Sequence, residues 1–141
     1  MGIRDHIRKL YTKYHTIEPF ELADAMGIKV HYMDLGNMCG FYYYEKRIKQ
    51  IFLNCNLPKH VQKFVLAHEI GHAVLHTRFN TIFLNTTYLS VDKLEIEANK
   101  FAVLLTLPNI ESVVAEGYSI PQMAMMYGLP EEMIRLRLQQ I

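Results

Sequence analysis

The stretch that decides the fold is VLAHEIGHAVLH at residues 65–76, where two histidines and a glutamate interrupt an apolar run. Apolar residues recur at helical spacing on both sides of them, which predicts one long and largely buried helix from the helix-start residues 54–58 to about His76. Buried polar side chains need partners, and unpaired ones are costly. The stretch therefore predicts a core helix that carries a functional site formed by its polar residues.

The spacing of the polar residues predicts a metal site. His68 and His72 are four residues apart, a rise of about 6 Å and a turn of about 400°, so both imidazoles project from one helix face and can bind one ion. Glu69 lies about 100° round the helix, where its carboxylate can reach a water beside the metal and act as general base. The alternative is a surface helix with incidental histidines.

A third metal ligand is expected downstream, because a catalytic zinc ion has three protein ligands and one open position for water. Glu95 and Glu97 are the candidates. We favour Glu95, because Asn99 shares its helix face four residues later and can support a ligand histidine. The other interpretation of Glu95 is a capping-box glutamate three residues after Asp92. Glu97 stays open as the third ligand.

Two other residue types in the chain could be taken for metal ligands. His76 lies one turn beyond His72, too far from an ion held between His68 and His72, so we interpret it as a supporting or structural residue. Cys39 and Cys55 are isolated cysteines outside any Cys-x-x-Cys pair, which predicts free thiols of a reducing compartment.

The remaining pattern predicts an α+β fold with a small, mostly antiparallel sheet of about three strands packed on the long helix. Residues 77–91 form a segment that is long for a connection and a natural place for a substrate-facing lid. A helix capped by Ser90 or Asp92 is expected to end at Pro108, and two or three short helices follow it. Before the long helix, the expected helices span residues 3–14 and 20–26, and the expected strands span 28–33, 40–44 and 48–53.

Length and composition set the class of protein. The 141 residues, 50% hydrophobic and 21% charged, fit a single globular domain over residues 1–141. A net charge of +1 offers no general phosphate-binding surface, so direct nucleic-acid binding is not expected. No apolar run reaches the roughly 18 residues of a membrane span, and the first residues form no apolar signal core. We expect a cytoplasmic protein without a membrane partner.

The motifs together resemble the ImmA/IrrE family of zinc metallopeptidases. The resemblance rests on HEIGHAVLH at residues 68–76, on EIEANKFA at 95–102 and on LLTLP at 104–108, with weaker similarity at 19–23, 27–28 and 51–54. It implies a compact zincin-like domain of the gluzincin type, zinc as cofactor, ligands His68, His72 and Glu95, and Glu69 as the residue that activates water. Gluzincins generally place Asp or Asn four residues after the ligand glutamate. Asn99 fits that position for Glu95, whereas Phe101 follows Glu97.

The resemblance also implies a function. Members of this family are associated with cleavage of helix-turn-helix repressors in phages and mobile elements. The chain is similar to the short, ImmA-like members, which implies a zinc endopeptidase that acts as an antirepressor, with a repressor as its protein partner. No motif identifies the group that stabilises the oxyanion; Tyr88, in the segment 77–91, is a candidate.

Two other functions fit parts of the sequence. Ala124-x-x-x-Gly128 followed by Ile134 has the spacing of a helix-turn-helix, but Glu131 and Glu132 begin the would-be recognition helix and would repel phosphate. Packing helices explain this segment better than a DNA-binding module. The other alternative is a non-catalytic scaffold that binds metal and sequesters a repressor, which would use the same ligands as an enzyme.

Overall fold

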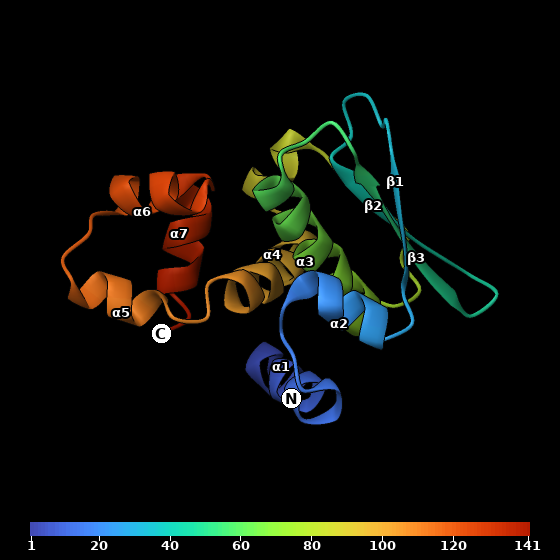
Figure 1. Cartoon of the computed structure of the whole chain (residues 1–141), viewed down its shortest axis with the longest axis horizontal. Helices are drawn as coiled ribbons and strands as arrows, with labels where there is room; N and C mark the ends of the chain where they lie inside the picture. Colours follow the sequence, from blue (N-terminus) through green and yellow to red (C-terminus); the bar gives the residue numbers. More distant parts are fainter.

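The computed structural model describes the whole chain, residues 1–141, and confirms an α+β fold with a mostly antiparallel sheet. Seven α-helices and one 3-10 helix accompany four strands, which lie at one end of the molecule in Figure 1. The helices are α1 (Ile3–Tyr14), α2 (Pro19–Ala25), α3 (Lys59–Leu75), η1 (Asn85–Leu89), α4 (Lys93–Thr106), α5 (Ile110–Ala115), α6 (Ile120–Tyr127) and α7 (Glu131–Leu138). The strands are β1 (Lys29–Met33), β2 (Gly40–Glu45), β3 (Ile48–Asn54) and β4 (Thr81–Phe83).

The sheet has the order β1-β3-β2-β4. Strands β2 and β3 form an antiparallel hairpin whose two turn residues, Lys46 and Arg47, have φ of 51° and 64°. Left-handed backbone at both turn positions matches the twist of a two-residue hairpin. β1 pairs with β3 in parallel, and β4 pairs antiparallel with β2 at the edge.

The segment 77–91 is more ordered than the sequence suggests. The sequence predicts about three strands, all before α3, and an irregular segment at residues 77–91. In the structure residues 81–83 of this segment form a fourth strand and residues 85–89 form η1. A three-residue strand has too short a pattern to recognise, and β4 exists because β2 offers it hydrogen-bond partners.

Helix α3 packs against the sheet on one side and against α4 on the other. Its glycine decides how close α4 comes: a Cβ added to Gly71 would lie 3.1 Å from the Cβ of Phe101 on α4. Ala98 and Ala102 on α4 are also fully buried, as expected for small residues at a close helix contact. The contact brings the polar residues of α3 and α4 together.

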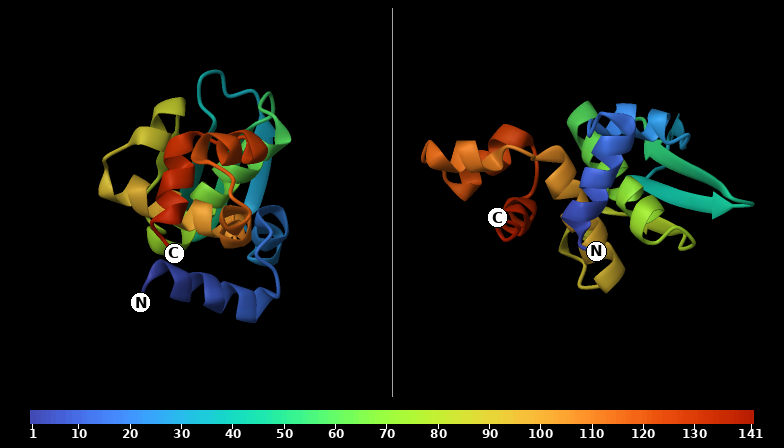
Figure 2. Two further views of the ribbon diagram at one scale, coloured as in Figure 1. Left: turned by 90° about the vertical axis from the view of Figure 1, so that its left-hand side faces the viewer. Right: turned by 90° about the horizontal axis from the view of Figure 1, so that it is seen from below.

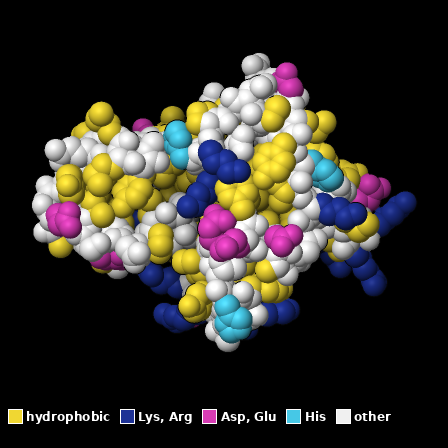
Figure 3. Space-filling model, in the orientation of Figure 1, with side chains coloured by type: hydrophobic (Ala, Val, Ile, Leu, Met, Phe, Trp, Pro, Cys, Tyr) yellow, Lys and Arg dark blue, Asp and Glu magenta, His cyan; other side chains and the backbone are white.

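The C-terminal helices α5 to α7 form the other end of the molecule and reach the core through α7, which contacts α4 (Figures 1 and 2). Ser119 forms a capping box with Gln122 at the start of α6, and Gly128 ends this helix with a φ of 65°. In Figure 3 hydrophobic side chains gather on the exposed surface of this end. Met125, the most exposed of them in α6, is 86% exposed.

The structure also describes the two cysteines and the apolar character of the helices. Cys39 and Cys55 are free cysteines, the first buried and the second exposed. None of the helices combines the length and the apolar character needed to cross a membrane.

Candidate metal centre

The polar residues of α3 form a fully buried cluster. His68, Glu69 and His72 have no exposed surface, and one ligand atom from each lies within 4.8 Å of the others. Nε2 of His68 lies 3.1 Å from Nε2 of His72, so the two imidazoles converge on one point, as their spacing predicts.

Helix α4 contributes Glu95 to the same point. Its Oε1 lies 2.5 Å from Nε2 of His72 and 3.5 Å from Nε2 of His68. Asp92 caps α4 by accepting hydrogen bonds from the N–H groups of Leu94 and Glu95, and the Glu95 side chain extends towards the histidines. In contrast, Oε1 of Glu97 lies 3.1 Å from Nε2 of His76. The two glutamates therefore contact different histidines.

Both buried carboxylate oxygens of Glu69 have no hydrogen-bond partner, and the buried Oε1 of Glu95 lies against the imidazoles of His72 and His68. Buried carboxylate oxygens without a partner are costly, so such a group normally has a cation or ordered water beside it. Two imidazole nitrogens and one carboxylate oxygen are a donor set that suits zinc and leaves a position open. The residues of the cluster fit a metal ion.

The cluster separates the protonation behaviour of its two carboxyl groups. Burial raises the pKa of Glu69 well above its usual range, and the nearby charge of Glu95 adds to the effect. Burial also acts to raise the pKa of Glu95, but its contacts with His68 and His72 outweigh burial and hold this pKa at about 2. Glu95 is thus the permanent anion of the cluster, while Glu69 can hold a proton. Two such carboxyl groups are typical of a site that moves protons.

Asn99 holds His68 from behind. Its Oδ1 lies 2.8 Å from Nδ1 of His68, and its Nδ2 donates to the carbonyl of Thr87 in η1 at 3.1 Å. With its amide nitrogen committed to Thr87, Asn99 presents a carbonyl oxygen that accepts the proton of Nδ1. This arrangement leaves Nε2 of His68 unprotonated and directed at the cluster.

His72 has a corresponding contact with His76, whose Nδ1 lies 3.0 Å from Nδ1 of His72. The sequence places His76 behind His72, but it offers no signal for the contact between His76 and Glu97. It also gives no signal for Phe83 of β4, whose ring packs edge-on against His68 with centroids 4.7 Å apart. Both contacts join segments that are distant in sequence.

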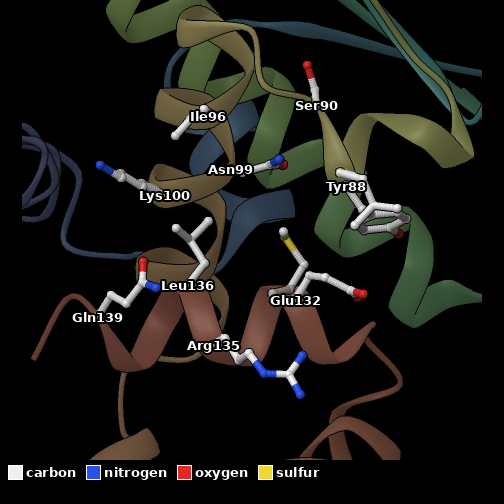
Figure 4. Close-up of a pocket in the computed structure, with 11 residues that line it drawn as sticks. Tyr88, Ser90, Ile96, Asn99, Lys100, Glu132, Arg135, Leu136 and Gln139 are labelled. Atoms are coloured by element: carbon white, nitrogen blue, oxygen red, sulfur yellow. The ribbon is translucent and has the colours of Figure 1, made fainter.

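Tyr88 lies in η1 and is packed among aromatic rings. Its ring lies 5.6 Å from that of Phe64 and 5.1 Å from that of Phe83. Burial, with a smaller contribution from Cys39, raises the pKa of Tyr88 to about 12. With Asn99 it lines a pocket of about 430 Å³ between η1, α4 and α7 (Figure 4). Its hydroxyl makes no hydrogen bond to the histidine cluster, so its role in stabilising an oxyanion stays a prediction.

Comparison with known proteins identifies the family of the chain. Residues 23–139 match the IrrE N-terminal-like domain. The chain is 41% identical to the "Uncharacterized immunity region protein 2" of Bacillus phage phi105, over 96% of this chain and 88% of the relative. It is 31% identical to the "Metallopeptidase ImmA" of Bacillus subtilis (strain 168), over 99% of this chain and 86% of the relative. The chain belongs to the ImmA/IrrE family of metallopeptidases.

Proposed function

We propose that this metallopeptidase is a zinc-dependent endopeptidase with His68, His72 and Glu95 as its metal ligands. The observation that carries the proposal is the convergence of Nε2 of both histidines and Oε1 of Glu95 in the buried contact between α3 and α4. The unpartnered carboxylate of Glu69 beside them supports a catalytic site over a closed structural one.

Zinc bound there would polarise the peptide carbonyl and make a water molecule more acidic. Glu69 then acts as the base that takes a proton from the attacking water and delivers it to the leaving amine. Its raised pKa suits this exchange, because the carboxyl can hold the proton between the two steps. Asn99 keeps His68 oriented throughout through the hydrogen bond to its Nδ1.

We further propose that the substrate is a helix-turn-helix repressor of a phage or mobile element. The immunity-region relative of phage phi105 supports a role in phage immunity. The family resemblance provides the substrate class. Under this proposal the protein is a regulatory protease whose partner is another protein.

The structure gives no support to the DNA-binding alternative. Arg137, one of two arginines in α7, is 1% exposed and donates to the carbonyl of Leu107 and to the carboxylate of Glu111. The other, Arg135, is paired with Glu131 at 2.9 Å. Arg137 is thus unavailable to a phosphate backbone, and Arg135 already has an acidic partner.

The test has two parts. Elemental analysis should find about one zinc per chain in protein purified without chelator, as expected for a site with three ligands. The zinc-loaded protein should then cut a helix-turn-helix repressor of a phage or mobile element at a defined bond, read by mass spectrometry of the fragments, and the Glu69→Gln variant should cut it far more slowly. Absence of zinc would contradict the metal assignment, and cleavage by both proteins at the same rate would contradict the role of Glu69.

A further inference from the structure

We propose that Glu97 is a positioning residue, which acts through His76 to hold His72 in the tautomer that can bind metal. This inference rests on the proposed function, because it takes His72 as a metal ligand. It assigns to Glu97 a role other than that of third ligand.

A continuous chain of side-chain contacts leads from the surface to the cluster. Oε1 of Glu97 lies 3.1 Å from Nε2 of His76, and Nδ1 of His76 lies 3.0 Å from Nδ1 of His72. The side chain of Glu97 is 35% exposed, that of His76 is 7% exposed, and that of His72 is fully buried. Each step inward removes water as an alternative partner, so the inner hydrogen bond depends on the outer one.

The carboxylate of Glu97, at the surface end of the chain of contacts, determines the direction of each hydrogen bond. An ionised carboxylate only accepts, so His76 must carry a proton on Nε2 to bond Glu97. In neutral His76 the other nitrogen, Nδ1, is then an acceptor and takes a hydrogen bond from Nδ1–H of His72. This leaves Nε2 of His72 with its lone pair directed at the cluster, which is the form a metal requires.

The opposite tautomer would defeat the site. A neutral His72 with its proton on Nε2 would direct an N–H at Oε1 of Glu95, which is 2.5 Å away, and would offer no lone pair to a metal. Oε1 of Glu95 itself favours that N–H, because it is a buried carboxylate oxygen directly beside Nε2 of His72. The hydrogen bonds from Glu97 through His76 to His72 oppose this preference. This gives the second carboxylate of α4, Glu97, its role.

The geometry of α4 argues against Glu97 as a ligand. Residues two apart are about 200° apart around a helix, so Glu95 and Glu97 leave α4 in different directions. Glu97 reaches His76, which caps the C-terminal end of α3 and is held there because its backbone N–H donates to the carbonyl of His72 at 2.7 Å. The ring of His76 is thereby fixed between the surface carboxylate and the buried imidazole.

The experiment measures the zinc affinity of the full chain by competition with a chromophoric chelator. For Glu97→Ala we expect about one zinc per chain to remain at saturation, with an affinity about 10–100-fold below that of the wild type. For Glu97→Gln we expect most of the affinity to return, since the amide carbonyl can still accept from Nε2–H of His76. Glu116→Ala, which removes an exposed glutamate without a side-chain partner, is the matched control and should behave as the wild type.

A double-mutant cycle tests whether Glu97 acts through His76. His76→Phe should lower the affinity as Glu97→Ala does, and the double variant should be no weaker than His76→Phe alone. If Glu97→Ala binds as tightly as the control, or if the two losses add, the relay is wrong. If Glu97→Ala loses zinc as completely as Glu95→Ala, Glu97 is a ligand. Absence of zinc from the wild type would instead overturn the proposed function.

Discussion

Glu95 on α4 and His72 on α3 meet with Oε1 of the glutamate 2.5 Å from Nε2 of the histidine. These residues are far apart in sequence and share one point only because α3 and α4 are packed face to face. Each helix alone presents an incomplete set of donors. The site is therefore a property of the helix contact, and its stability and its chemistry are linked.

The first prediction concerns Glu95. Replacing it with Ala removes one of three proposed ligands, so zinc should be lost, and with it the stabilisation that binding gives the folded state. We expect little zinc by elemental analysis and a melting temperature that no longer responds to added zinc. Glu116→Ala, which removes an exposed glutamate far from the cluster, is the control and should retain the metal. Equal zinc content in wild type and Glu95→Ala would show that another residue completes the site.

The second prediction separates binding from catalysis at Glu69. Glu69→Gln keeps the shape of the side chain and removes its basicity, so we expect wild-type zinc content and cleavage of the repressor lowered by about 10²–10⁴-fold. Fragment formation over time, measured by gel densitometry, reads this effect. Loss of zinc in Glu69→Gln would instead show that Glu69 contacts the metal directly.

The third prediction follows from the raised pKa of the same residue. In the metal-free protein the folded state holds a proton on Glu69 at a pH where the unfolded chain, with a pKa of about 4.3, has released it. Folding therefore binds a proton, and the free energy of unfolding falls as the pH rises from the unfolded pKa towards the folded one. Glu69→Gln should remove this loss.

Urea unfolding with a chelator present, at pH 5 and at pH 8, measures the difference. We expect Glu69→Gln to have a higher free energy of unfolding than the wild type at pH 8. The difference between the two proteins should be smaller at pH 5. If the free energy of unfolding depends on pH in the same way in the wild type and in Glu69→Gln, Glu69 is not desolvated in the folded protein.

Much of this arrangement could be predicted from the sequence, because its signals are local. The apolar spacing around residues 68–72 indicates α3, and Asp92 marks the start of α4. The spacing of Glu95 and Asn99 by one helical turn places the two side chains towards α3, where the structure has them. Single-helix geometry was sufficient for each of these.

The rest depended on contacts between distant segments. The parallel pairing of β1 with β3 leaves no mark in either strand, since turn signals fix only the hairpin of β2 and β3. The edge strand β4 has only three residues and forms by pairing with β2. Glu97 was open as a ligand because its distance to His76 depends on how α4 crosses the end of α3. That the chain is one domain over residues 1–141 stays a prediction.

The fourth prediction concerns Asn99. Asn99→Ala leaves Nδ1–H of His68 and the carbonyl of Thr87 without partners in a buried place, which should cost about 1–3 kcal/mol of stability. Zinc affinity should also fall, by about 10–100-fold, because His68 is no longer held in its metal-binding tautomer. Chelator competition and thermal unfolding measure the two effects. Asn99→Asp, which keeps an acceptor for His68 but not the donor to Thr87, should recover affinity more than stability.

The last prediction concerns the approach of α4 to α3 at Gly71. In an exposed helix interior, replacing Gly with Ala stabilises by about 1 kcal/mol, so the expected sign depends on the space available. A Cβ on Gly71 would lie 3.1 Å from the Cβ of Phe101, an atom fixed to the α4 backbone that cannot swing away. The helices must move apart by a few tenths of an ångström, and overpacking of a core costs about 1–3 kcal/mol.

We therefore expect Gly71→Ala to lower the melting temperature of the metal-free protein and to weaken zinc binding as well, since separating the helices moves Glu95 away from His72. Thermal unfolding with and without zinc distinguishes the two effects. A variant with a higher melting temperature and unchanged zinc affinity would show that the contact between α3 and α4 yields without disturbing the ligands, and the site would then depend less on helix packing than the geometry indicates.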